Sequence, residues 1–154
     1  MKHRYLYIIL LIAVISACRK KTTPTTSNYS KALISTCRTY LGTPYKFGGI
    51  DKRGMDCSGL VYASFLEMGI KLPRISHQQA NYFEEIDRKD IREGDLVYFK
   101  VSGKTINHTG VITKIVSKEE VMFIHSSTSK GVREDNLFSK FWEGKFVKAT
   151  RPQF

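Results

Sequence analysis

Residues 42–61 read GTPYKFGGIDKRGMDCSGLV, a glycine-rich loop followed at once by an apolar stretch. The glycines and the proline between residues 42 and 56 are typical of an irregular loop. From Cys57 onward, apolar residues recur at helical spacing, and Gly69 follows the last of them. We therefore expect a helix that begins at Cys57 and stops at Gly69, with an inner face made of Leu60, Val61, Ser64, Phe65 and Met68.

Two further helices are predicted on either side of this stretch. Between Asn28 and Leu41 the apolar residues again recur at helical spacing, and Gly42 ends the pattern. Cys37 lies on the apolar face of that helix, where a cysteine normally acts as a small buried hydrophobe. A short helix is expected over residues 76–83.

The second half of the chain changes to the pattern of β-strands. Residues rich in Val, Ile, Phe and Tyr predict strands over 95–100, 110–116, 121–125 and 146–150, with a hairpin turn at residues 118–120. Helices first and strands afterwards favour an α+β fold in which N-terminal helices pack on an antiparallel β-sheet.

The N-terminus has the pattern of a secretory signal. Lys2 and Arg4 precede an apolar run that ends in Ile15-Ser16-Ala17-Cys18, and the run is shorter than the ~20 residues that span a bilayer. A cysteine directly after small residues resembles the bacterial lipobox, in which that cysteine is lipidated; ordinary cleavage nearby is the alternative. The expected organisation is a signal peptide (1–17), a lipidated Cys18 with a flexible tether (18–28), and one domain (29–154).

The charge balance indicates an anionic partner or surface. The chain has 25 Lys and Arg against 14 Asp and Glu, a formal net charge of +11. Removal of the signal leaves +9, and a third of that excess belongs to Arg19, Lys20 and Lys21 of the tether, which would meet lipid headgroups. Because the domain lacks a basic stripe with interleaved aromatics, nucleic acid is not an expected partner. Three cysteines without a C-x-x-C pair argue against a zinc ribbon, a thioredoxin-type redox site and a disulfide-dense scaffold.

Cys57 is the candidate nucleophile. It stands at the first turn of a predicted helix, where unpaired backbone N–H groups and the helix dipole favour a thiolate. A base is also needed, and His108 and His125 both fall in the strand half of the chain. A cysteine on a helix, a histidine on a sheet and a second polar group that orients the first ring form the papain-type arrangement. Such a pair requires no metal.

Five motifs, in order from about residue 29 to 151, resemble the NlpC/P60 family of cell-wall cysteine peptidases. They are Gly42-Thr43-Pro44-Tyr45-Lys46-Phe47-Gly48-Gly49, Asp56-Cys57-Ser58-Gly59-Leu60-Val61, Leu72-Pro73-Arg74-Ile75-Ser76-His77-Gln78-Gln79, Gly94-Asp95-Leu96-Val97-Tyr98-Phe99 and His108-Thr109-Gly110-Val111-Ile112. The resemblance implies a papain-like core and hydrolysis of an amide in peptidoglycan stem peptides, often between D-glutamate and the diamino acid, without a cofactor or metal.

The resemblance also implies roles for individual residues. Cys57 would be the nucleophile, His108 the base, and His125 the residue that holds the His108 ring in the useful tautomer. Tyr45 matches the family tyrosine beside the nucleophile, whose hydroxyl can stabilise the oxyanion. The positions that match the substrate side, or lie in a loop near the cleft, are Asp56, Ser58, Arg74 and Ser76.

For two of these residues a structural role is also expected. Asp56 fits equally well as a helix N-cap, which would accept bonds from backbone N–H groups. Arg74 is expected as a free, solvated charge more than as a ligand.

Two other functions stay open at this stage. The first is a related cysteine amidase or acyltransferase that acts on another amide or ester. The second is a lipoprotein that binds the cell wall without cutting it. In all three cases the predicted location is the bacterial cell envelope, with the chain anchored by lipid on the periplasmic side of the outer membrane.

Overall fold

The computed structural model describes residues 26–153 of the 154-residue chain. The predicted signal peptide, Cys18 and all but the last residues of the predicted tether lie outside the described residues. Within residues 26–153, no helix has both the length and the apolar character needed to cross a membrane.

The elements follow one another along the described chain with helices concentrated in the first half. In order they are α1 (Thr26–Arg38), β1 (Ile50–Asp51), β2 (Gly54–Met55), α2 (Cys57–Glu67), α3 (Ser76–Gln79), β3 (Glu84–Ile86), a 3₁₀ turn (Arg88–Asp90), β4 (Leu96–Phe99), β5 (His108–Ile115), β6 (Val121–Ser127), β7 (Gly131–Asn136), α4 (Lys140–Glu143) and β8 (Phe146–Arg151).

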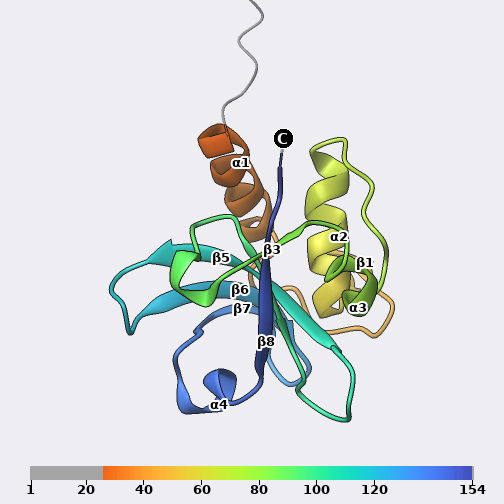
Figure 1. The fold of residues 1–154 in the computed structure, drawn as a ribbon. Coiled ribbons are helices and arrows are strands. Elements are labelled where there is room, and N and C mark those ends of the chain that lie inside the picture. Colours follow the sequence, from red (N-terminus) through yellow and green to blue (C-terminus); the bar gives the residue numbers. More distant parts are fainter. Residues whose placement is uncertain (1–25, 154) are drawn as a thin grey trace, which may run out of the picture.

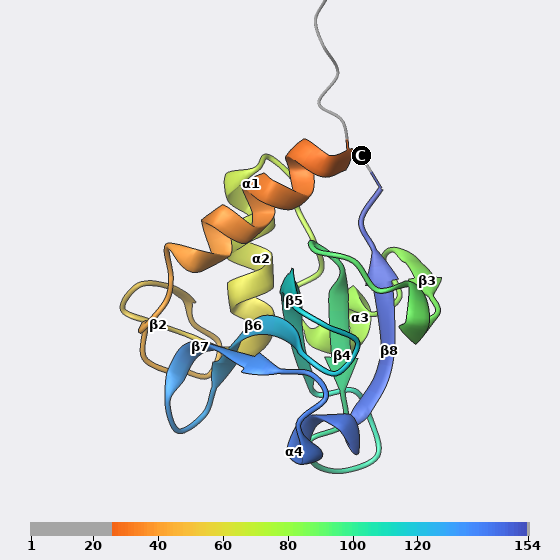
Figure 2. The ribbon, with the colours of Figure 1, turned by 90° about the vertical axis from the view of Figure 1, so that its left-hand side faces the viewer.

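Six of the strands form one antiparallel sheet in the order β3-β8-β4-β5-β6-β7, and β1 pairs with β2 in a separate hairpin. Helices α1 and α2 lie over one side of this sheet, while α4 lies on the other side (Figures 1 and 2). The predicted α+β class, with N-terminal helices packed on an antiparallel sheet, is therefore confirmed.

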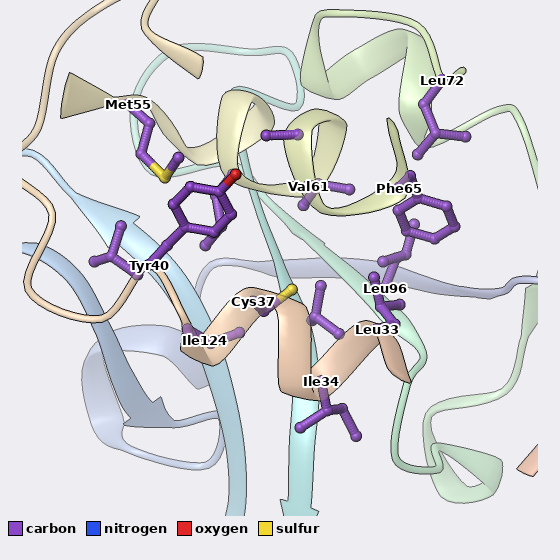
Figure 3. Close-up of a cluster of buried hydrophobic side chains, with 14 of the residues drawn as sticks. Leu33, Ile34, Cys37, Tyr40, Met55, Val61, Phe65, Leu72, Leu96 and Ile124 are labelled. Carbon is purple, nitrogen blue, oxygen red and sulfur yellow. The ribbon is translucent and has the colours of Figure 1, made fainter. Parts of the chain in front are cut away.

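The main core fills the space between the two helices and the sheet (Figure 3). Helix α1 contributes Leu33 and Cys37, and both are almost fully buried, which confirms the predicted role of Cys37 as a small buried hydrophobe. Helix α2 contributes Val61 and Phe65, and the sheet contributes Leu96 among others. This packing fixes the position of α2, and therefore of its first residue, against the centre of the sheet.

A second apolar cluster covers the opposite face of the sheet. Its aromatic members are Phe99 on β4, Phe123 on β6 and Trp142 on α4. Because successive side chains of a strand point to opposite faces, Val97 and Phe99 enter this cluster while Leu96 and Tyr98 enter the first. Strand β4 is therefore apolar on both faces, as its uninterrupted Leu-Val-Tyr-Phe sequence requires.

Several boundaries differ from the prediction. Helix α1 begins at Thr26, inside the segment predicted as tether, and ends at Arg38 instead of Leu41. Helix α3 stops at Gln79 instead of residue 83, because Glu84–Ile86 pairs with β8 and draws the chain into the sheet. Strand β7 was not predicted: it is an edge strand with the polar sequence GVREDN.

Candidate active site

Cys57 is the first residue of α2, and its position depends on the residue before it. Asp56 is the N-cap, and its Oδ1 accepts a hydrogen bond from the backbone N–H of Gly59 at 2.7 Å, so the predicted capping role is confirmed. The Cys57 Sγ lies 3.8 Å from the carbonyl oxygen of Asn107, and the backbone N–H of Thr109 also interacts with it. The sulfur therefore lies against the start of β5, between the two neighbours of His108.

Three polar side chains on neighbouring strands form a hydrogen-bonded line. His108 Nε2 on β5 lies 3.0 Å from His125 Nδ1 on β6, and His125 Nε2 lies 2.9 Å from Asp135 Oδ2 on β7. The pairing of β5 with β6 and of β6 with β7 brings these residues together. The structure thus unites the two histidines selected from the sequence and adds a carboxylate that the sequence had not indicated.

This line fixes which ring nitrogens carry protons. An ionised carboxylate can only accept, so His125 Nε2 carries the hydrogen that Asp135 receives. When the His125 ring is neutral, its Nδ1 is then an acceptor, and His108 Nε2 donates to it. The remaining nitrogen of His108, Nδ1, keeps its lone pair, which is the state that a general base for Cys57 requires.

Aromatic rings hold both imidazoles in place. The Trp142 ring stacks on His108 with centroids 5.1 Å apart and an interplanar angle of 23°, and Phe123 stacks on His125 at 4.9 Å and 22°. Trp142 also donates from Nε1 to Asp135 Oδ2 at 3.1 Å. One tryptophan therefore contacts both ends of the line.

The ionisation of the pair differs from the sequence-based expectation. Burial raises the pKa of Cys57 to about 11, and the N–H groups of Thr109 and Ser58 only partly offset it, so a thiolate favoured by the helix start was a wrong prediction for the free protein. Burial, followed by the electrostatic influence of His125, lowers the pKa of His108 to about 3. Both shifts favour a neutral thiol and a neutral imidazole at these two residues.

Tyr45 lies in the glycine-rich loop that precedes α2. It is half-buried in the glycine-rich loop, which a bridge between Tyr45 and Met55 holds next to the start of α2. Burial raises the pKa of the Tyr45 hydroxyl, and its electrostatic interactions with Cys57 and Asp56 raise it further. The phenol is therefore protonated at neutral pH and available as a hydrogen-bond donor.

Of the four residues assigned to the substrate side, three are joined by hydrogen bonds and the fourth, Ser76, is not part of that network. Arg74 donates from Nη2 to Asp56 Oδ2 at 2.8 Å and from Nη1 to Ser58 Oγ at 2.9 Å, so the expectation of a free, solvated Arg74 is wrong. These three residues form one network beside Cys57. Ser76 is buried at the start of α3 and takes no part in the hydrogen bonds of that network.

Sequence reasoning missed Asp135, Arg133 and Trp142. Asp135 follows two charged residues in a polar strand that lacks the alternating apolar pattern used to predict strands. Only the pairing of β6 with β7 shows that Arg133 lies opposite His125. The only sequence feature that could have found them is the short segment between β6 and β7, which is typical of a hairpin. Among residues 26–153, no group of three or more His, Cys, Asp or Glu side chains is arranged to hold a metal ion.

Comparisons with known proteins identify the family of the chain. The model of the NlpC/P60 family matches residues 42–151. The chain is 32% identical to the probable endopeptidase NlpC of Escherichia coli strain K12, over 96% of this chain and 99% of the relative. It is 35% identical to the murein DD-endopeptidase MepS/murein LD-carboxypeptidase of the same organism, over 71% of this chain and 56% of that protein.

A solved structure gives the same result for the fold. An NlpC/P60 family protein from Bacillus cereus ATCC 10987 superposes with a TM-score of 0.70 at 26% identity, over 79% of this chain and 39% of that one. The predicted papain-like, NlpC-type core is therefore confirmed. With the family model covering most of the described domain, the chain belongs to the NlpC/P60 family.

Proposed function

We propose that this protein is a peptidoglycan endopeptidase that cuts an amide bond of the stem peptides by cysteine chemistry. The observation that carries the proposal is the placement of the Cys57 sulfur against the backbone on either side of His108, whose Nε2 is occupied by His125. Two relatives are named as an endopeptidase and as a murein endopeptidase, which supports the same substrate class.

The proposed reaction begins with proton transfer from Cys57 Sγ to His108 Nδ1 while the sulfur attacks the amide carbonyl carbon. The backbone N–H of Cys57 and the Tyr45 hydroxyl are the proposed donors to the oxyanion. The His108 imidazolium then gives its proton to the leaving nitrogen as the C–N bond breaks, which leaves a thioester. A water molecule, deprotonated by His108, releases the acyl group and restores the thiol.

His125 is the proposed third member of the site. Its ring accepts from His108 Nε2 and so keeps the lone pair of His108 on the nitrogen needed for proton transfer. We further propose that Asp56, Ser58, Arg74 and Ser76 form the wall that the substrate meets, with the first three held rigid by their mutual hydrogen bonds.

The bond that is cut is proposed from the family resemblance to be the one between D-glutamate and the diamino acid. One relative is named for DD-endopeptidase and LD-carboxypeptidase activity, so the bond must be determined directly. Mass spectrometry of the fragments released from purified peptidoglycan distinguishes these cleavages. Release of a fragment that ends in D-glutamate would support the proposed bond.

Replacement of the nucleophile tests the chemistry. Cys57→Ala should abolish hydrolysis of purified peptidoglycan, because no other group in the site can form the thioester. The matched control is Cys37→Ala, which removes the other cysteine of residues 26–153; that thiol is fully buried in the core, away from the start of α2. Full activity of Cys57→Ala would exclude the mechanism, and its loss in both variants would point to misfolding.

A related cysteine amidase or acyltransferase shares this geometry and differs only in its acyl donor or acceptor. Activity on lipid or protein amides, with none on stem peptides, would favour that alternative. A protein that binds cell wall without cutting it would retain binding and show no Cys57-dependent product.

We also propose that Cys18 is the lipidated N-terminus of the mature chain and anchors it on the periplasmic side of the outer membrane. The support is the small-residue sequence before Cys18 and the basic, apolar segment that precedes it. Incorporation of a labelled fatty acid, compared between the natural chain and Cys18→Ala, tests the anchor.

A further inference from the structure

Asp135 ends a line of side chains that begins at the proposed base. From His108 the line runs through His125 to Asp135 with nitrogen–nitrogen and nitrogen–oxygen distances of 3.0 and 2.9 Å. His108 and His125 are both buried, so each ring nitrogen in this line needs a partner inside the protein. Asp135 supplies the last partner and the negative charge.

The carboxylate of Asp135 is itself held from two sides. Trp142 Nε1 donates to its Oδ2 at 3.1 Å, and Arg133 Nη2 lies 2.6 Å from its Oδ1. Burial alone would raise the pKa of Asp135, but the hydrogen bonds from His125 and Trp142 and the charge of Arg133 outweigh it and lower the pKa to about 2. Asp135 is therefore an anion throughout the neutral range.

The charges around this line come from several elements. His125 on β6 and Arg133 on β7 face Asp135 directly, and Lys130 shares with it a surface pocket of about 340 Å³. The protonation of His108 on β5 is influenced electrostatically by His125, Asp135 and Asp56. Of these groups, Asp135 and Asp56 stabilise a positive charge on His108, whereas His125 opposes it.

We propose that Asp135 is a positioning residue for the active site: it fixes the proton positions of both histidines and stabilises the imidazolium that forms on His108 as Cys57 attacks. This inference rests on the proposed function. Asp135 acts through His125 and does not touch the reacting atoms.

The hydrogen-bond directions explain why a carboxylate is required at this position. A carboxylate can only accept, which forces the hydrogen of His125 onto Nε2 and leaves His108 Nδ1 free to accept a proton. An asparagine amide can also donate to His125 Nε2. In that arrangement both rings reverse, and His108 presents an N–H to Cys57 instead of a lone pair.

Asp135→Asn in the full chain tests the proposal through the pH dependence of peptidoglycan hydrolysis. We expect kcat to fall by at least about 10-fold and by up to about 10⁴-fold, the loss seen when an amide replaces the carboxylate behind a catalytic histidine and leaves the ring in the wrong tautomer. Both limbs of the pH profile should move to lower pH, because removal of a negative charge makes a neighbouring imidazolium and thiol lose their protons more readily.

Arg133→Gln is a second test, in which the expected shift of the pH profile has the opposite direction. The Arg133 side chain is 38% exposed, so this variant should fold even if Asp135→Asn does not. Removal of this positive charge should move the limbs to higher pH. The matched control is Asp95→Asn, which removes a buried carboxylate paired with Arg151 at the other end of β4 from His108. That variant should lower the melting temperature and leave the limbs in place.

The ring protons can also be observed directly by ¹⁵N NMR of histidine-labelled, folded protein. We expect His108 protonated on Nε2 in the natural chain and a mixture of tautomers in Asp135→Asn. Unchanged limbs in both the Asn and the Gln variants, or an unchanged tautomer, would overturn the role of Asp135. Absence of hydrolysis by the natural chain, or hydrolysis that survives Cys57→Ala, would instead overturn the proposed function.

Discussion

At the scale of single residues, Asp56 joins three segments around the position of Cys57. Its two carboxylate oxygens accept from the backbone of Gly59 at the start of α2, from the backbone of Gly48 in the glycine-rich loop, and from the Arg74 guanidinium. Burial alone would raise the pKa of Asp56, but these donors outweigh it and lower the pKa below its usual value. Asp56 therefore sets the position of the nucleophile by charge and geometry together.

We expect the Asp56–Arg74 pair to contribute measurably to stability. The side chains are 10% and 31% exposed, so Asp56→Asn and Arg74→Gln should each lower the unfolding free energy by about 2–3 kcal/mol, because each leaves a mostly buried charge without its partner. The double variant should lose less than the sum of the two. Urea unfolding monitored by circular dichroism measures all three.

The exposed Asp51–Arg53 pair in the neighbouring hairpin is the matched control, with side chains 45% and 89% exposed. Its Asp51→Asn and Arg53→Gln variants should be indistinguishable from the natural chain, since solvent screens exposed pairs. Additive losses for Asp56 and Arg74 would contradict a direct coupling between them.

At the scale of elements, the start of α2 lies so close to the glycine-rich loop that only glycine fits at residue 59. A Cβ on Gly59 would stand 2.1 Å from the carbonyl oxygen of Gly49, and that backbone atom cannot rotate away. Gly59→Ala should therefore separate α2 from the loop, lower the unfolding free energy by about 1–3 kcal/mol and reduce hydrolysis, because Cys57 moves with the helix.

Gly144→Ala is the corresponding control. It has a φ of −70°, and the nearest atom to an added Cβ is 3.9 Å away, so alanine should be tolerated and can stabilise by about 0.4–1 kcal/mol. Thermal unfolding and activity of the two variants can be compared directly. Equal behaviour would show that the contact between α2 and the loop does not limit the site.

Much of this arrangement could be predicted from the sequence because its elements have strong local patterns. Helix α2 has a capping residue, Asp56, apolar residues at helical spacing, and a glycine after its end, Gly69, whose φ is +80°. Its start was therefore predicted correctly. Strand β7 carries little apolar periodicity at the sheet edge, so the strand pattern predicted neither β7 nor the position of Asp135. The protonation of Cys57 was predicted wrongly because burial arises from α2 and β5 coming together, which no local pattern reports.

At the scale of the whole molecule, folding places several titratable groups in the interior in their neutral form. Burial lowers the pKa of His108 to about 3, whereas it raises the pKa of Cys37 to about 12 and that of Cys57 to about 11. The unfolded chain has the ordinary values of 6.5 for histidine and 9.0 for cysteine. The stability of the fold should consequently depend on pH from both sides.

The sign of each contribution follows from proton linkage. His108 has a lowered pKa in the folded protein, so its contribution is complete above pH 6.5 and is lost as the pH falls toward 3. Cys37 and Cys57 have raised pKa values in the folded protein, so their contributions to stability are complete below pH 9. These contributions are lost as the pH rises toward 12 for Cys37 and toward 11 for Cys57. We expect a stability maximum between these limits, with slopes of up to about 1.4 kcal/mol per pH unit for each proton.

His108→Gln isolates the acidic side of this curve. Without the buried imidazole, the loss of stability on acidification should no longer begin near pH 6.5 but only near pH 4, where aspartates of the unfolded chain, with an ordinary pKa of 3.8, begin to bind protons and the lowered pKa values of Asp56 and Asp135 keep the folded protein from doing so. Urea unfolding between pH 3 and pH 10, followed by both tryptophan fluorescence and circular dichroism, measures the two curves. If the variant lost stability from pH 6.5 in parallel with the natural chain, the acid sensitivity would belong to another group, and His108 would not be held neutral by the packing of Trp142 and β6 around it.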